Sequence, residues 1–371
     1  DILMKKLVCC VICIVLCMFV KVSFATDVDI DTFLNETKQY TADFFPNLNS
    51  QNIVDELING GNIDSKSLLN KVVDIFIGKI KENAKIIFSI IAVSILCSIL
   101  KNVQSTFGGN VSEIAFYVCY LFIIILIITS YTDVISVCRN TITKLNNFMN
   151  MLIPLVLGLL VTNGNIVSVS ILQPVLLVMT SIINVVISNV ILPIIFVSTM
   201  MNLIGNISEN IKISKIPKLL QKTCLWCLEF ILIIFIGVLS IEGTLGANVD
   251  GVTAKAAKSI VSTVIPVVGK ALSDATDSIL GATMITRNAV GIVGMIAIIS
   301  IVLNPLISVL IMMITYNVAA ALIEPIVDSR ISQCMSGMGD SIKIVFALMA
   351  TVCMLFIIST TIMIKIGNFS I

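Results

Sequence analysis

The residues that could carry chemistry gather in one stretch of the chain, between residues 250 and 287. This stretch is the least apolar part of a long apolar region. The candidates for lining a pore or docking a partner are Asp250, Lys255, Lys258, Pro266, Lys270, Asp274, Asp277, Arg287 and the more distant Glu324. Ionisable groups at membrane depth usually face a water-filled cavity or a partner. We therefore expect either a helix pair that dips into the membrane beside an aqueous path, or an amphipathic pair on the membrane surface.

Motifs for catalysis are incomplete throughout the sequence. The chain contains no histidine, which excludes a His-based triad and a His-ligated metal. Gly337-Met-Gly-Asp340 matches the GxGD pattern of intramembrane aspartyl proteases, but those enzymes need a second Asp in a neighbouring span, and no other clear span has one. We expect Asp340 to cap a helix that begins near Ser341. A serine–lysine dyad is left open; otherwise the sequence predicts no enzyme, no cofactor and no metal site.

The elements that position these residues are apolar helices. The chain has 371 residues, of which 57% are hydrophobic and 12% charged, and its formal net charge is +1. Soluble domains carry about 25% charged residues, so the composition excludes a soluble enzyme, a disordered protein and a nucleic-acid binder with a basic field. The sequence predicts an all-α, polytopic integral membrane protein with about six to eight transmembrane or re-entrant helices. The apolar runs are residues 86–100, 114–131, 149–162, 166–187, 190–205, 225–241, 284–303, 306–323 and 344–364.

Two regions precede these apolar runs. Residues 1–25 have the pattern of a signal peptide that starts at Met4, with two lysines, an apolar stretch and small residues at a cleavage site. An uncleaved anchor is the alternative, which Lys21 favours. We expect residues 26–83 to form a polar, extracytoplasmic helical region and residues 84–371 to form the polytopic membrane domain.

Charge sets the expected orientation of the membrane domain. The lysines of segment 208–222 outnumber its acidic residues, which places this segment in the cytoplasm. With the N-terminal region outside, the polar segment 132–148 is also placed outside. An odd number of crossings must then lie between residues 149 and 206. Three short spans satisfy this requirement, and so does one span with a re-entrant hairpin.

An offset of 112 residues aligns two halves of the chain, 149–241 and 261–364, and indicates a parallel internal repeat. In this alignment Pro193 falls on Pro305. Paired apolar segments broken by proline point to a binding or permeation site in transporter-like folds. The alternative is that the prolines only kink membrane helices, which tolerate them.

Several short motifs resemble one protein family. They are Asp250-Gly-Val-Thr-Ala-Lys255, Ile265-Pro-Val-Val-Gly-Lys-Ala-Leu-Ser-Asp274, Asp277-Ser-Ile-Leu-Gly281, Asn288-Ala-Val-Gly291 and Ala319-Ala-Ala-Leu-Ile-Glu-Pro325. In combination, and in the order of signal peptide, polar region and polytopic body, the chain resembles the stage III sporulation protein AE family of endospore-forming bacteria. The resemblance covers most of the chain and is strongest at residues 246–326.

The resemblance implies a core membrane subunit of the channel or secretion-like complex between mother cell and forespore, which endospore formation requires. The implied location is the mother-cell membrane that surrounds the forespore, as a multi-pass protein in the lipid bilayer. The implied partners are the other stage III sporulation A-group proteins, including a cytoplasmic ATPase and ring-forming proteins, and a forespore-side channel partner, with no nucleic acid. Two alternatives stay open: a structural assembly hub without a permeation role, and an ordinary secondary transporter.

Overall fold

The computed structural model describes residues 30–41, 65–107, 110–162, 165–205, 215–264 and 268–366. Within these ranges every regular element is a helix, which confirms the all-α prediction. The helices are α2 (Ile30–Thr41), α4 (Ser65–Phe107), α5 (Asn110–Thr162), α6 (Ile166–Val186), the π-helix η1 (Ile187–Ile191), α7 (Leu192–Gly205), α8 (Lys215–Val264), α9 (Val268–Ile323) and α10 (Ser329–Ile366). The expected signal peptide at residues 1–25 lies outside the described residues.

Six helices in the described ranges are long and apolar enough to cross a membrane, which confirms a polytopic membrane protein. Their apolar stretches are Asn70–Ile99, Tyr117–Thr162, Ile166–Gly205, Lys215–Ile241, Thr283–Ile323 and Ser329–Ile366. Large apolar side chains such as Phe88, Phe230 and Ile233 remain exposed on these helices. Contiguous apolar surface of this kind marks contact with lipid or with another protein.

Several apolar runs that the sequence separates lie on one continuous helix. Neither set of crossings expected between residues 149 and 206 is observed, because residues 149–162 are the end of α5 and a single helix continues from Ile166 to Gly205 through η1. Pro305 likewise lies inside α9 and does not end it. The polar segment 132–148, expected outside the membrane, is the middle of α5. Apolar helices tolerate proline where neighbouring groups satisfy the freed backbone.

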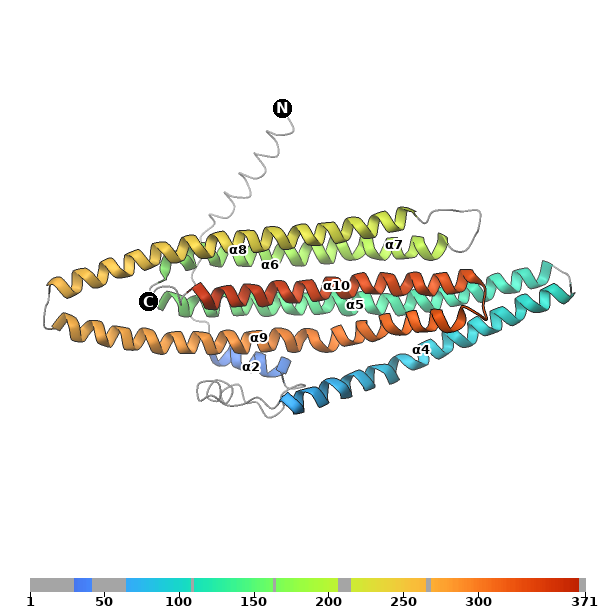
Figure 1. Ribbon diagram of the computed structural model, residues 1–371, viewed down its shortest axis with the longest axis horizontal. Coiled ribbons are helices and arrows are strands. Elements are labelled where there is room, and N and C mark those ends of the chain that lie inside the picture. Colours follow the sequence, from blue (N-terminus) through green and yellow to red (C-terminus); the bar gives the residue numbers. More distant parts are fainter. Residues whose placement is uncertain are drawn as a thin grey trace, which may run out of the picture.

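The long helices lie side by side in an elongated bundle (Figure 1). α9 packs along α10, α5 and α4, while α6 and α7 pack against α8 on the other side. α2 packs on α9 and also touches α5, where the ring of Phe148 lies 6.0 Å from that of Phe33 and 5.9 Å from that of Tyr40. The successive helices α4, α5 and α6 pack side by side, and so do α9 and α10, whereas α8 and α9 diverge from the point where they are connected (Figure 1).

The two halves of the expected repeat share one order of elements. In the first half, the continuous helix that contains Pro193 is followed by the returning helix α8. In the second half, α9 contains Pro305 and is followed by the returning helix α10. The two proline-containing helices run in the same direction along the bundle, as a parallel repeat requires (Figure 1).

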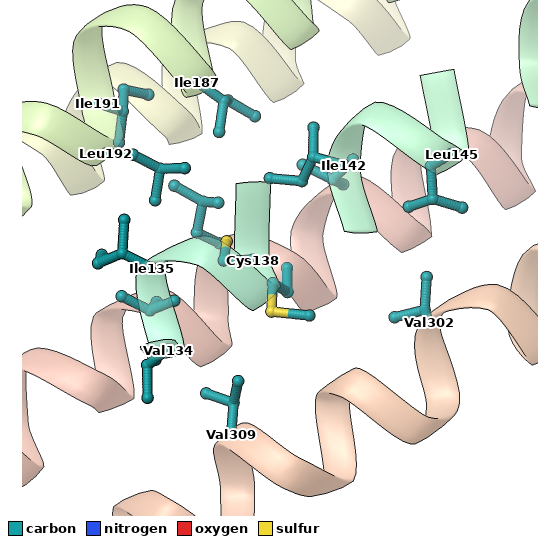
Figure 2. Packing of buried hydrophobic residues seen from close by; sticks show 14 of the residues in the cluster. Val134, Ile135, Cys138, Ile142, Leu145, Ile187, Ile191, Leu192, Val302 and Val309 are labelled. Carbon is teal, nitrogen blue, oxygen red and sulfur yellow. The ribbon is translucent and has the colours of Figure 1, made fainter. Parts of the chain in front are cut away.

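Apolar side chains fill the middle of the bundle (Figure 2). On α5, buried side chains recur every three or four residues, which is the helical period. The side chains that meet there from α5, η1, α7 and α9 include Val134, Ile135, Cys138, Ile142, Leu145, Ile187, Ile191, Leu192, Val302 and Val309. Lipid is as apolar as these side chains, so their packing stabilises the bundle through close van der Waals contact.

Candidate functional site

The polar stretch that the sequence singled out forms the ends of two long helices. Asp250, Lys255 and Lys258 lie on α8, whereas Lys270, Asp274 and Asp277 lie on α9. Pro266 lies in the connection at 265–267, outside the described residues, and so do the side chains of residues 242–280. Their predicted roles as pore-lining or docking groups therefore stay predictions.

The backbone of this stretch continues the two membrane helices without a break. The apolar part of α8 ends at Ile241 and that of α9 begins at Thr283. Beyond these points the two helices run on to Val264 and from Val268, and together they project past the other helices at one end of the bundle (Figure 1). We call residues 242–264 and 268–282 the helical arm. The backbone of the arm is thus neither a separate re-entrant pair nor a separate surface pair.

Arg287 lies at the base of the helical arm and is fully buried. Its Nη2 donates a hydrogen bond to the carbonyl oxygen of Ile364, at 3.1 Å, in the last turn of α10. One turn further along α9, Gly291 lies against the Ile364 side chain so closely that a Cβ atom would collide with it. The last carbonyls of a helix lack intrahelical donors and favour a cation nearby. Arg287 therefore stabilises the contact between α9 and the end of α10.

Two acidic residues, Glu324 and Asp340, are exposed on the outside of the bundle. Glu324 is exposed in the turn after α9. Asp340 is exposed in the interior of α10, so the expected helix start near Ser341 is wrong. The helix begins earlier because Asp328 accepts a hydrogen bond from the backbone N–H of Arg330, at 2.9 Å, which caps the first turn.

A cluster of small and polar residues joins α10 to three other helices. Ser341 is buried and donates a hydrogen bond to the carbonyl oxygen of Gly337 at 3.0 Å, while Gln221 of α8 donates to the Ser341 hydroxyl at 3.2 Å. A Cβ atom on Gly337 would lie 2.5 Å from Nδ2 of Asn202 on α7. One on Gly339 would collide with the side-chain amide of Asn317 on α9. We call these residues the glycine junction: Asn202, Gln221, Asn317, Gly337, Gly339 and Ser341.

The glycine junction gives the Gly-Met-Gly-Asp motif a structural role. Glycine leaves room for a neighbouring side chain at the helix backbone, and small residues four apart, such as Gly337 and Ser341, are typical of close helix–helix contacts in membranes. From the sequence alone, this motif indicates only a match to protease chemistry and a helix cap at Asp340. The spacing of small residues on one helical face was the signal that could have found the junction.

A second polar contact lies at the π-helical turn. In η1 the Leu192 N–H bonds to the Ile187 carbonyl, five residues back. The next donor in this register would be residue 193, which is a proline without an N–H. Arg139 of α5 supplies the replacement, because its Nη2 donates to the Ser188 carbonyl at 3.3 Å. The guanidinium of α5 thereby satisfies the backbone group that proline leaves open.

Further polar contacts join α5, α7 and α8. The Thr199 hydroxyl donates to the Tyr131 hydroxyl at 3.1 Å, and the Tyr131 ring stacks on Phe196 with ring centroids 6.0 Å apart. The Ser198 hydroxyl donates to the Pro217 carbonyl at 2.8 Å. Among the described residues, no three His, Cys, Asp or Glu side chains gather to bind a metal ion. The contacts above all serve to join helices.

Comparisons with known proteins agree with the resemblance seen in the sequence. Residues 48–367 match the family described as Stage III sporulation protein AE. The chain is 32% identical over 315 residues to Stage III sporulation protein AE of Bacillus subtilis (strain 168), and the alignment covers 84% of this chain and 79% of that protein. No solved structure matches the chain.

Proposed function

The chain belongs to the stage III sporulation protein AE family, and from this premise we propose that it is the core membrane subunit of a channel or secretion-like complex between mother cell and forespore. The proposed location is the mother-cell membrane around the forespore. The proposed partners are the other stage III sporulation A-group proteins, with a cytoplasmic ATPase and ring-forming proteins among them, and a forespore-side channel partner. The proposed role is not enzymatic.

The projection of the helical arm beyond the bundle supports a role within a complex. It extends two membrane helices beyond the rest of the bundle (Figure 1). Its sequence holds charged residues on both helices, including Lys255, Lys258, Asp274 and Asp277. A projecting pair of charged helices offers water-soluble partners a surface that a chain confined to the bilayer lacks.

The packed middle of the bundle bears on the alternatives. Apolar side chains from α5, η1, α7 and α9 occupy it (Figure 2). A solute therefore has no polar route through that part of a single chain. This packing disfavours a secondary transporter, which would enclose its own substrate site. It is compatible with a subunit whose outer surface forms one wall of a solute path, and with a structural hub.

Gene deletion tests the proposed function. We expect normal vegetative growth, followed by small forespores that collapse after engulfment, when cells are followed by microscopy. A growth or solute-uptake defect with normal forespores would show that the chain is an ordinary transporter.

Substitutions in the arm then separate a permeation role from a hub. Asp274→Asn and Asp277→Asn would stop spore formation and leave co-purification of the complex intact if the arm serves permeation. Loss of co-purification with the same variants would identify a hub. Glu229→Gln, on the exposed side of α8 outside the arm, is the control for a nonspecific effect of removing one acidic charge on co-purification.

A further inference from the structure

One face of α5 is polar over the whole middle of the helix. Between residues 129 and 150, every exposed residue is polar, and the exposed positions recur at the helical period. These residues, which we call the α5 polar face, are Thr129, Thr132, Asp133, Ser136, Arg139, Asn140, Thr143, Lys144, Asn147 and Asn150. At a rise of about 1.5 Å per residue, the face is about 30 Å long, which is the thickness of the hydrocarbon core of a bilayer.

The start of α5 and the buried side of its middle differ sharply from the polar face. Nearer the start of α5, the exposed side chains are large and apolar, among them Val118, Phe122 and Ile125. Behind the polar face, Cys138 and Ile142 are buried in the packed middle of the bundle (Figure 2). The exposed polar residues therefore occupy one side of the middle of α5, and the side chains buried behind them are mostly apolar, apart from Ser130, Thr141 and Asn146.

Two hydrogen bonds show which part of α8 lies at the same height along the bundle axis as the polar face. We call this height the level of the face. The Arg139–Ser188 contact places the middle of α5 beside residue 188. The Ser198–Pro217 contact places residue 198 beside residue 217 of α8. α8 runs antiparallel to the helix formed by η1 and α7, and both helices rise by the same distance per residue. Residue 188, ten before residue 198, therefore lies beside about residue 227, ten after residue 217. Residue 139 of α5 and about residue 227 of α8 therefore lie at the same level.

At this level the molecule presents two different surfaces. On α8, the side chains of Trp226, Phe230 and Ile233 are 60%, 63% and 66% exposed, and Glu229 is the charged residue among them. On α5, the exposed residues at the corresponding positions are amides, hydroxyls and charges. A wide apolar surface suits lipid, whereas charges at membrane depth are costly unless they face water or a partner. The two sides of one bundle are thus built for different surroundings.

We propose that the α5 polar face is one wall of a water-filled path at membrane level that admits small polar solutes. This inference rests on the proposed function, because neighbouring subunits of the complex must close the path on its other side. Asp133, Arg139 and Lys144 bring charges of both signs, and the remaining groups are neutral donors and acceptors. Such a wall can replace hydration contacts of solutes without selecting one sign of charge.

Cysteine labelling tests the surroundings of the face directly. Asn140→Cys, Thr143→Cys and Asn147→Cys probe the polar face, and Phe230→Cys and Ile233→Cys are matched controls near the same level on α8. Membrane fragments whose two surfaces are both accessible to reagents are treated with a charged, impermeant thiol reagent or with a lipophilic maleimide. Labelling is counted above that of the parent chain, whose described cysteines are buried or half-buried. We expect at least a tenfold faster charged-reagent reaction on the polar face than on α8.

Three outcomes of the labelling would overturn the proposal. Reaction of the polar face with the lipophilic maleimide alone would place the face in lipid. Protection from both reagents, lost when the partner proteins are deleted, would show that a protein covers it. Equal reaction of both faces with the charged reagent would place this whole level outside the membrane. None of these outcomes depends on whether gene deletion impairs sporulation, so failure of the inference and failure of the proposed function are distinguishable.

Apolar substitution tests whether the water-facing wall is used. Thr143→Leu together with Asn147→Leu makes the wall apolar, and Phe230→Leu together with Ile233→Leu is the control on α8. We expect the α5 variant to lower spore yield at least a hundredfold while the chain still inserts and co-purifies with its partners. Normal spore yield with this variant would overturn the assignment of the face to a solute path.

Discussion

The middle of α5 and the first half of α10 both carry polar residues within apolar helices. The two regions differ in where these residues lie relative to the neighbouring helices. At the glycine junction, α10 turns Gly337, Gly339 and Ser341 toward neighbouring helices, where amide side chains from α7, α8 and α9 meet them. On the middle of α5 every exposed residue is polar, and the buried residues are mostly apolar, with Ser130, Thr141 and Asn146 as the buried polar ones. Similar composition therefore serves helix association in one region and contact with the surroundings in the other.

The effect of a polar residue in this membrane protein depends on whether another helix covers it. A polar group between helices is satisfied by the chain itself and contributes to stability. An exposed charged or amide group at membrane depth is costly unless it also faces water or another chain. We therefore expect substitutions at the glycine junction to act on folding and substitutions on the α5 polar face to act mainly on function.

The largest effect is expected from overfilling the glycine junction. Gly339→Leu places a large side chain where Asn317 lies and should destabilise the protein by about 1–3 kcal/mol. The control is Gly158→Leu on α5, because nothing lies within 4 Å of a Cβ at that position. The measurement is the midpoint of thermal unfolding of the purified protein in detergent.

A second substitution sharpens this test. Asn317→Ala opens the space next to Gly339, so in the Gly339→Leu background it should restore part of the lost stability. Equal midpoints for Gly339→Leu and Gly158→Leu would contradict a close contact at the junction.

A smaller effect is expected at the π-helical turn, where the α5 polar face makes one contact inside the bundle. Arg139→Met removes the donor to the Ser188 carbonyl and should cost about 1 kcal/mol. Lys144→Met, an exposed change on the same face, should remain within about 0.5 kcal/mol. Thermal unfolding compares the two variants, and hydrogen exchange of the amides at 187–192 should rise only for Arg139→Met. Unchanged exchange in η1 would show that the guanidinium does not satisfy this turn.

The smallest effect compares one serine from each region. Ser341→Ala removes a buried hydroxyl that Gln221 contacts, and interhelical hydrogen bonds in membranes contribute about 0.6 kcal/mol on average. Ser136→Ala removes an exposed hydroxyl and should cost less. Unfolding in mixed detergent micelles can resolve the pair. A larger loss for Ser136 would reverse the contrast between the two regions.

The class and the helices could be predicted because hydropathy is a property of the sequence alone. Long apolar runs must form helices in a membrane, where every backbone group needs an internal partner. Their number between residues 149 and 206 could not be predicted in the same way. Pro193 resembles a break, and whether the helix continues depends on Arg139, a residue more than fifty positions earlier that satisfies the opened backbone.

The candidate site could be predicted only in part, because the sequence does not show which side of a helix is covered. The sequence places Arg287 next to the charges of the arm, yet its side chain is buried against the end of α10. The sequence predicts an external polar segment at residues 132–148, which holds all of the α5 polar face except Thr129 and Asn150. Their spacing of three and four was visible in the sequence, but only the packing of Cys138 and Ile142 shows which face remains open.

The continuity of α9 also has a mechanical consequence. From the tip of the helical arm to Ile323 it is one rod, about 84 Å long at the usual rise per residue. Arg287 and Gly291 couple this rod to the end of α10 near the base of the arm. A force applied to the tip of the arm would reach this coupling point along one continuous helix, without passing through a loop that could absorb it.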